Sequence, residues 1–340
     1  MSRSIAVIGG GNGALAVAGA AAIAGHRVAL WDRYLEDHAE LIARPEITLT
    51  GRIEGIGRIE RPIDDLAATI ADAELIEVVV PGFALAWVAT ALLPLVSPGQ
   101  KVLLHPGGSG GTLEVAHLWR DAEADRGVVI GMTDTLAYAA RAVGPTEVHI
   151  HAEKRWVMVS ALDPQATESL MSVVGEVHSQ AHAAASTMEI ALANLNPVIH
   201  PPITLLNAGR IDAGQGFSLY GDGVGMSVAS LIDALDRERV TLAAGLGVPA
   251  VSLHEWVERA YGVRADDTSA LFEELDREVY GGLLAPASLD TRYLTEDVPL
   301  GLAVTVELAA EAGIDVPVTE SVVRLARVVL NRVTAVEGVG

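Results

Sequence analysis

The chain has 340 residues, half of them hydrophobic, no cysteine and a formal net charge of −21 at pH 7. Its length predicts two domains rather than one core. The acidic balance argues against nucleic acid and anionic membranes as partners, and the lack of cysteine excludes disulfides, thiolate metal sites and a cysteine nucleophile. No apolar stretch is long enough to span a bilayer, so we expect a cytoplasmic protein.

The N-terminal segment alternates short apolar runs with an alanine-rich stretch. Residues 4–8 are apolar and end in glycines, residues 14–24 have a helical composition, and residues 27–31 are apolar again and end at Asp32. This order of strand, glycine turn, helix, strand and acid predicts a Rossmann βαβ unit, which binds a dinucleotide.

The glycine turn is expected to hold a pyrophosphate. Gly9 allows the tight turn, Gly11 lets the backbone approach the phosphates, and Ala14 is small enough for helix–strand packing. The helix then presents free N–H groups and its positive dipole end to the phosphates. The predicted cofactor-binding residues, here and further along the chain, are Gly9, Gly11, Asn12, Gly13, Ala14, Asp32, Arg33, Pro81 and Gly107.

Asp32 and Arg33 give opposite indications about the cofactor. Asp32 can accept hydrogen bonds from the adenosine ribose and would repel a 2′-phosphate, which favours NAD. Arg33 can receive a 2′-phosphate, so NADP is also allowed.

Several further strands are expected in the first half of the chain. They lie at residues 75–80, 101–104 and 127–131, with a hairpin within 51–62 and a final strand pair at 147–152 and 155–160.

The glycine-rich loop 105–111 follows one of these strands. Because ligands bind at the carboxyl ends of strands in open α/β sheets, we expect this loop near the nicotinamide.

Two histidine pairs have spacings that metal sites use. His149 and His151 alternate on one face of an expected strand, and His178 and His182 have helical i,i+4 spacing. No third ligand accompanies either pair, so we predict no metal site.

After about residue 185 long helical patterns replace the strand signals. We therefore predict a doubly wound parallel Rossmann domain at 1–185 and an all-α substrate domain at 186–340, with a substrate cleft between them. The expected helices are 224–245, 249–261, 268–280, 300–313 and 319–336.

His200 stands among three prolines. Pro197 can open a helix, whereas Pro201 and Pro202 are expected to break the regular backbone and leave the imidazole at an irregular point where it can be aimed. A proline-rich corner with a structural histidine is the alternative.

The polar segment 285–299 lies between two expected helices. Arg292 could hold a carboxylate in a two-pronged pair, and Asp297 could accept the second ring N–H of His200 and fix its tautomer. The alternative is a capping loop in which Thr295 or Asp297 is the N-cap before Pro299.

Several segments, in the same order along the chain, resemble the octopine/nopaline, or opine, dehydrogenases. They are residues 9–14, 105–108, 135–141, 196–201 with 205–209, and 292–299. The resemblance implies an NAD(P)H-dependent condensation, in which a 2-oxo acid and the amine of an amino acid form an imine that takes a hydride. The reverse reaction oxidises the secondary amine.

The resemblance also implies roles for single residues. It makes His200 the acid/base, Asp297 its partner and Arg292 the anchor for a substrate carboxylate. Asn196 lies one helical turn before His200 and could face the same cleft.

The segment 135–141 carries the departures from the family pattern. Ala140 replaces a cysteine of the arginine-using members, and Tyr138 stands in a changed Leu136–Tyr138 segment. We expect Tyr138 and Ala140 to contact an amine substrate that is uncharged or smaller than arginine.

Two rival functions remain. A ketopantoate or 3-hydroxyacid reductase has this layout but needs a catalytic lysine in the helical domain, and no lysine follows Lys154. A non-catalytic NAD-binding regulatory protein would not need His200, Arg292 and Asp297 together. The expected partners are small-molecule substrates, with neither nucleic acid nor membrane, and a homodimer is one assembly that the sequence allows.

Overall fold

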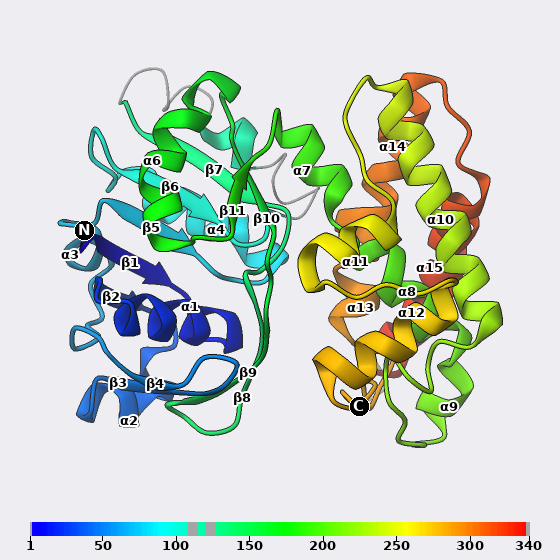
Figure 1. Ribbon diagram of the computed structural model, residues 1–340, viewed down its shortest axis with the longest axis horizontal. Coiled ribbons are helices and arrows are strands. Elements are labelled where there is room, and N and C mark those ends of the chain that lie inside the picture. The colour runs from blue at the N-terminus through cyan, green and yellow to red at the C-terminus, as the bar shows by residue number, and fades with distance from the viewer. Residues whose placement is uncertain (1, 108–114, 120–126, 338–340) are drawn as a thin grey trace. The chain divides into compact units, whose positions relative to one another are not determined.

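The computed structural model describes residues 2–107, 115–119 and 127–337. The chain forms two compact units, and the division falls between Ala191 and Leu192. It lies inside helix α7 (Thr187–Ala193), just after the boundary that the change of pattern near residue 185 predicts. In Figure 1 the first unit runs from blue to green and the second from green to red.

The first unit contains a seven-stranded sheet. Its strands, in spatial order, are β11 (Ala181–Ala183), β10 (Val157–Ala161), β7 (Val129–Thr133), β6 (Lys101–Leu104), β5 (Leu75–Val78), β1 (Ser4–Ile8) and β2 (Arg27–Trp31). The five strands from β7 to β2 are parallel, whereas β10 is antiparallel to β7. The predicted Rossmann sheet is confirmed.

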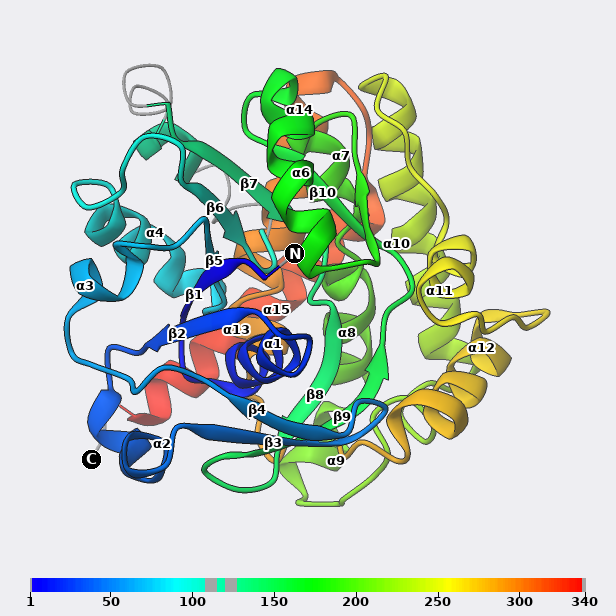
Figure 2. The ribbon, with the colours of Figure 1, turned by 60° about the vertical axis from the view of Figure 1, so that its left-hand side comes forward.

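A second, four-stranded sheet has the order β4 (Gly55–Arg58), β3 (Glu46–Gly51), β9 (Glu147–Glu153) and β8 (Tyr138–Ala142). Helix α1 (Asn12–Ile23) contacts strands of both sheets and lies between them (Figures 1 and 2). Its side chains from Ala14 to Ala21 are buried, which explains why this helix is built from alanine rather than from an amphipathic pattern.

The predicted hairpin within 51–62 is present as β3 and β4, but it begins earlier. The predicted pairing of residues 147–152 with 155–160 is wrong, because β9 belongs to the smaller sheet and β10 to the larger one. Burial explains the separation: every second residue of β9 is buried, whereas β10 is buried throughout. An alternating strand suits a sheet with one open face, and a fully apolar strand suits a sheet covered on both faces.

The remaining helices of the first unit connect its strands. They are the 3₁₀ turns η1 (Leu35–His38) and η2 (Pro164–Ala166) and the helices α2 (Ala39–Ala43), α3 (Leu66–Ile70), α4 (Gly82–Leu92) and α6 (Thr167–Val177). Among them, α3 and α6 contact the larger sheet. The helical spacing assigned to His178 and His182 is wrong, because α6 ends before His178 and His182 lies in β11.

The second unit is helical, as predicted. Its elements are α8 (Asn196–Leu206), α9 (Ala208–Asp212), α10 (Met226–Gly245), α11 (Leu253–Tyr261), α12 (Thr268–Leu275), α13 (Arg292–Thr295), α14 (Ala303–Ala312) and α15 (Pro317–Glu337), with π-helical turns η3 (Asp276–Tyr280) and η4 (Val298–Leu302). Helix α11 begins later than predicted because Ser252 and Glu255 form a capping box. Within the described ranges, no helix combines the length and the apolar character that crossing a membrane requires.

Helix α8 corrects the prediction about the prolines. The helix continues through Pro201 and Pro202, so His200 lies within regular backbone and not at a break. Each interior proline removes one backbone donor and costs about 3 kcal/mol in an isolated helix. The residues from Pro197 to Leu205 are all buried, and this tertiary packing outweighs the unfavourable propensity.

Gly301 sets the distance between α8 and η4. A Cβ atom at this position would overlap the ring of Pro197, at the start of α8. Gly301→Ala should therefore lower the free energy of unfolding by about 1–3 kcal/mol, because the packed ring has no room to move. Urea denaturation measures the change.

Gly209→Ala is the matched control. A Cβ atom there meets open space. Alanine should leave the stability unchanged or raise it by up to about 1 kcal/mol. Equal effects of the two substitutions would contradict the packing argument.

Candidate active site

His200 and Asp297 form a hydrogen-bonded pair in the second unit. Nδ1 of His200, on α8, lies 2.8 Å from Oδ2 of Asp297, which precedes η4. The two side chains are 6% and 12% exposed. A carboxylate can only accept here, so Nδ1 carries the proton and Nε2 is the nitrogen that exchanges protons.

The capping alternative for this segment does not describe the structure. Asp297 occupies the N-cap position of η4, but its side chain makes no capping hydrogen bond. The Thr295 hydroxyl donates to the backbone oxygen of Thr291, within α13. The side chain of Asp297 instead orients the His200 imidazole.

Tyrosines surround the His200 ring. The Tyr293 ring centroid lies 4.2 Å from that of the imidazole, and the Tyr220 hydroxyl lies 3.1 Å from Nε2. Tyr280 in turn packs on Tyr220 at 4.5 Å between centroids. These neighbours were not predicted, although the sequence carries a signal: the chain has 6 tyrosines, and all but Tyr34 and Tyr138 follow His200.

Arg292 and Asn196 lie close to this pair in the sequence and in the fold. Arg292 is the first residue of α13, and its guanidinium lies 5.8 Å from the Tyr293 ring centroid. It is exposed, and among the described residues it makes no ion pair, so it is available to a carboxylate. Asn196 opens α8 one turn before His200 and is half-buried.

The first unit contains the predicted cofactor residues. Gly9 has a φ of +129°, which an L side chain rarely adopts, and it forms the turn after β1. The N-cap residue of α1, Gly11, makes no side-chain cap, and a Cβ atom there would meet open space. The first N–H groups of α1 therefore face room for a phosphate. Asn12 accepts a hydrogen bond from the Ala142 backbone N–H, which ties α1 to β8.

Gly10 and His38 also belong to this region, although they were not among the predicted cofactor-binding residues. Asp32 Oδ1 accepts the Tyr34 backbone N–H at 2.9 Å, and Oδ2 lies 3.2 Å from His38 Nε2. A Cβ atom on Gly10 would overlap both Asp32 and His38. The residues thus fit a dinucleotide: a bare glycine turn lies beside a carboxylate that is held in place.

Arg33, Pro81 and Gly107 lie around the same sheet. The Arg33 guanidinium lies 4.4 Å from the Trp87 ring centroid, on α4. Pro81 is the N-cap residue of α4, and the Gly107 N–H donates to the Thr133 oxygen at 3.0 Å. Residues 108–111 of the predicted nicotinamide loop lie outside the described ranges.

Tyr138 and Ala140, the predicted amine contacts, lie on β8 in the first unit. Tyr138 is 7% exposed and packs in the core that includes α1. Burial raises the pKa of its hydroxyl. Ala140 adjoins a register irregularity between β8 and β9.

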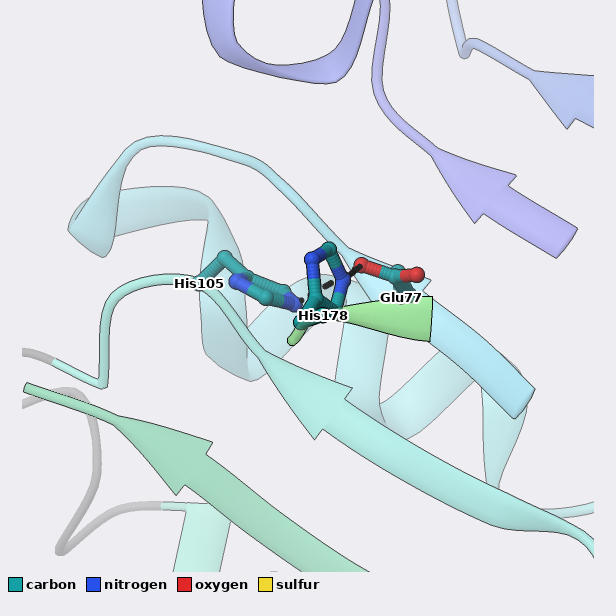
Figure 3. Close-up of side chains that lie close together, drawn as sticks. All are labelled: Glu77, His105 and His178. Atoms are coloured by element: carbon teal, nitrogen blue, oxygen red, sulfur yellow. Dashed lines mark hydrogen bonds and ion pairs between the residues drawn. The ribbon is translucent and has the colours of Figure 1, made fainter. Parts of the chain in front are cut away.

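A second buried histidine–carboxylate group lies in the first unit (Figure 3). Nε2 of His178, after α6, lies 2.9 Å from Glu77 Oε2, on β5. Nε2 of His105, after β6, lies 2.9 Å from the same oxygen, without hydrogen-bond alignment. All three side chains are almost completely buried. The signal for this group was Glu77, the only charged residue in the apolar run 75–80.

The charges of this trio balance. Burial alone would raise the pKa of Glu77, but the two histidines outweigh it and hold that pKa below its ordinary value. Burial would lower the pKa of His178, but the Glu77 carboxylate outweighs it and raises that pKa. Burial lowers the pKa of His105. A neutral His105 thus lies beside a His178–Glu77 ion pair.

The three ligand atoms lie within 4.8 Å of one another, as they would around a metal ion, so the prediction that His178 has no set of three potential ligands is wrong. A closed metal site takes four ligands, and within the described residues this group supplies three. His149 and His151, whose rings are 4.7 Å apart, gain no third ligand in the same part of the chain. The described contacts make this group a buried His178–Glu77 ion pair with His105 beside it.

A Rossmann sheet joined to a helical unit that carries a buried histidine–aspartate pair defines a two-unit, dinucleotide-dependent dehydrogenase. Residues 183–330 match the family described as NAD/NADP octopine/nopaline dehydrogenase, alpha-helical domain.

Several relatives match nearly the whole chain. The opine dehydrogenase of Arthrobacter sp. (strain 1C) is 31% identical over 326 residues, which cover 95% of this chain and 90% of the relative. The vitopine synthase of Allorhizobium ampelinum is 27% identical over 96% of this chain and 91% of its own length. An octopine dehydrogenase solved with NADH and L-arginine has a TM-score of 0.79 at 21% identity, over 97% of this chain and 90% of that one.

The chain belongs to the octopine/nopaline, or opine, dehydrogenase family. It is an NAD(P)-dependent oxidoreductase that acts on CH–NH bonds, and its reaction is the reductive condensation of a 2-oxo acid with an amine.

The Glu77 ion pair gives a stability prediction. His178→Leu should lower the free energy of unfolding at pH 6 by on the order of 3–5 kcal/mol, because it leaves a carboxylate buried without its charged partner. The double variant Glu77→Leu/His178→Leu removes both charges and should be more stable than the single one. Urea denaturation followed by circular dichroism measures both.

The pKa shifts set the pH window of this effect. The contribution of Glu77 is present above its ordinary pKa of 4.5 and is lost as the pH falls through the lowered folded-state pKa. The contribution of His178 is full below its ordinary pKa of 6.5 and is lost as the pH rises through the raised one. A single variant as stable as the wild type at pH 6 would show that the pair is not charged.

Proposed function

We propose that His200 is the acid/base of this condensation and that Asp297 orients it. The observation that carries the proposal is the 2.8 Å hydrogen bond between Nδ1 of His200 and Asp297. It fixes the tautomer, makes Nε2 the proton-exchanging atom and stabilises the imidazolium that forms when the ring accepts a proton.

The reaction needs proton transfers at two points. The amine nitrogen must lose a proton before it attacks the carbonyl carbon of the 2-oxo acid. The hydroxyl of the resulting carbinolamine must gain a proton before it leaves as water and the imine forms. Nε2 of His200 accepts the first proton and donates the second. Reduced nicotinamide, when bound, supplies the hydride for the imine carbon.

Arg292 anchors a substrate carboxylate in this proposal. Its planar guanidinium is exposed next to Tyr293, whose ring covers His200, so a carboxylate held there would lie close to the imidazole. Asn196, one turn before His200, is the polar group that could direct the amine or the carbonyl.

The amine partner is an uncharged or smaller amine than arginine. The octopine dehydrogenase neighbour was solved with L-arginine. We assign the segment 135–141 to the amine, and this segment departs from the pattern of the arginine-using members at Tyr138 and Ala140. A strict preference for arginine in a substrate panel would contradict this assignment.

The rival reductase lacks its proton donor. Lys154 lies in the first unit, its Nζ donates to the Leu136 oxygen at 2.7 Å, and burial lowers its pKa to about 8. No lysine follows it in the helical unit.

We also propose that the enzyme acts in the cytoplasm, which the lack of cysteine supports. We propose in addition that it forms a homodimer, which light scattering tests.

NADH consumption over a matrix of substrates tests the reaction. Pyruvate and 2-oxoglutarate are each combined with L-alanine, L-leucine, L-methionine, L-arginine and taurine. Oxidation should require both partners. Oxidation that ignores the amine would indicate a hydroxyacid reductase, and NADH binding without any turnover would indicate the regulatory protein.

His200→Ala should lower kcat by on the order of 10²–10⁴, since it removes the proton carrier. NADH binding, followed by fluorescence, should not change. Asp297→Asn should lower kcat as well, because an amide does not hold the Nδ1–H tautomer or stabilise the imidazolium.

His254→Ala removes another histidine of the same unit, one that bonds Thr268. Its kcat should stay within about twofold of the wild type, well outside the range expected for a lost acid/base. An unchanged kcat in His200→Ala would return His200 to a structural role.

Asp32 should set the preference for NAD. Asp32→Ser removes a charge that repels a 2′-phosphate, so the affinity for 2′,5′-ADP should rise relative to AMP by roughly tenfold, about 1.4 kcal/mol. Calorimetry measures both ligands without turnover. The exposed Asp37 is the matched control, and Asp37→Ser should change the ratio little. Equal shifts would show a general effect of charge.

A further inference from the structure

A row of tyrosine hydroxyls leads away from His200. Nε2 of the imidazole lies 3.1 Å from the Tyr220 hydroxyl, which precedes α10. The Tyr280 ring, on η3, packs against the Tyr220 ring with 4.5 Å between centroids, and the Tyr280 hydroxyl lies 2.8 Å from the Tyr261 hydroxyl, at the end of α11. His200 is 4% exposed and Tyr220 7%, whereas Tyr261 and Tyr280 are partly exposed. The row therefore begins at a buried imidazole and ends at a residue that reaches the surface.

The family reaction gives this row a task. Condensation of a 2-oxo acid anion with an ammonium group, followed by hydride transfer, yields a secondary ammonium acid, NAD(P)⁺ and one water, and it consumes one proton. The two transfers described above leave His200 neutral once the imine has formed, so the consumed proton is the one that the secondary amine takes up after hydride transfer, and His200 must receive it and pass it on once in each turnover. Its ring is buried, and Asp297 holds the Nδ1 side, so the proton has to arrive at Nε2, the nitrogen that Tyr220 contacts.

The tyrosines suit proton transport. Each hydroxyl can donate one hydrogen bond and accept another at the same time. Burial, with Tyr280 and Tyr293 nearby, raises the pKa of Tyr220 well above its ordinary value. Burial also raises the pKa of Tyr280. Both hydroxyls thus keep their protons between transfers and can pass one on only as they receive another.

Apolar packing isolates the row. The Phe272 ring stacks on Tyr220 with 5.7 Å between centroids, and the Trp256 ring packs edge-on against Tyr261 at 5.9 Å. Phe272 is fully buried. Side chains that only filled space could all be phenylalanine, whereas here a hydroxyl is retained at each of three successive positions.

We propose that Tyr261, Tyr280 and Tyr220 form a relay that, once the hydride has been transferred, delivers to Nε2 of His200 the proton that the product amine takes up. The proposal rests on the role of His200 given above. Solvent protonates the Tyr261 oxygen while its own proton moves to Tyr280, the Tyr280 proton moves to Tyr220, and the Tyr220 proton moves to Nε2. Each oxygen loses one O–H bond and gains one, and the relay runs backwards when the enzyme oxidises its product.

Tyr280→Phe tests the relay, because it removes the central hydroxyl and keeps the ring. With pyruvate, the fastest amine of the matrix and excess NADH, the first hydride transfer should keep the wild-type rate, since the proton carried by the relay is needed only after the hydride has been transferred. Later turnovers should slow by about 10²-fold, the lower end of what acid–base catalysis contributes. Stopped-flow absorbance should show a burst of one NADH per site, and the solvent deuterium isotope effect on kcat should rise.

Tyr261→Phe interrupts the outer link and should give the same burst. Thr204→Val is the matched control, because it removes a buried hydroxyl of α8 that bonds the His200 backbone oxygen and not its ring. It should produce no burst and no change in the isotope effect. A purely structural role of Tyr280 would slow the first and later turnovers equally.

The outcomes separate the relay from the role of His200. Loss of activity in His200→Ala together with wild-type steady-state rates and isotope effects in Tyr280→Phe and Tyr261→Phe would overturn the relay alone. Full activity in His200→Ala would overturn the role of His200, and the relay with it. A pH-indicator dye supplies a second readout: in the oxidative direction, proton release should lag behind NADH formation in Tyr280→Phe and coincide with it in the wild type.

Discussion

The helical unit depends on one contact, the hydrogen bond between His200 and Asp297, which joins residues 97 positions apart. One partner lies on α8 and the other at the start of η4. Gly301 in η4 lies against Pro197 of α8 with no room for a Cβ atom, so the backbones that carry the pair are fixed close together. The prolines of α8 stiffen the helix beside this contact, and the burial of the helix on all sides offsets their unfavourable helix propensity. A buried pair at such a distance needs a rigid frame, since a small displacement would leave the carboxylate buried without its partner.

The chain contains two buried histidine–carboxylate pairs, and their surroundings separate their roles. Glu77 is 0% exposed and lies in the middle of a sheet, so its pair with His178 exchanges protons with nothing outside the core. Asp297 is 12% exposed, the His200 ring contacts the Tyr220 hydroxyl, and the exposed Arg292 lies next to Tyr293, whose ring packs on His200. The same two chemical groups thus stabilise one unit and are suited to chemistry in the other. The two pairs differ in role because only the His200–Asp297 pair can exchange protons with groups outside the core.

Local patterns predicted much of this molecule. The glycine turn, the alanine-rich helix and the acid after the second strand lie within a short segment, and the structure places them as the Rossmann pattern requires. The residue types allowed a pairing of His200 with Asp297 and the family resemblance implied it, because spacing alone cannot show a contact between distant residues. Three features had no local signal strong enough: the assignment of β9 and β10 to different sheets, the continuation of α8 through Pro201, and the tyrosines around His200. Each depends on packing between segments far apart in the sequence, which outweighs local propensity.

The choice of tyrosine around His200 follows from the charges of the site. A carboxylate in the position of Tyr220 would hold the imidazole proton and would repel the carboxylates of both substrates in a protein that already carries a net charge of −21. A lysine there would repel the imidazolium that forms during the reaction. A tyrosine hydroxyl stays neutral, donates and accepts at once, and brings an apolar ring that keeps water away from the imine. A buried acid/base that must be reloaded in every cycle therefore needs neutral hydroxyls next to it, and the helical unit supplies them from three separate segments.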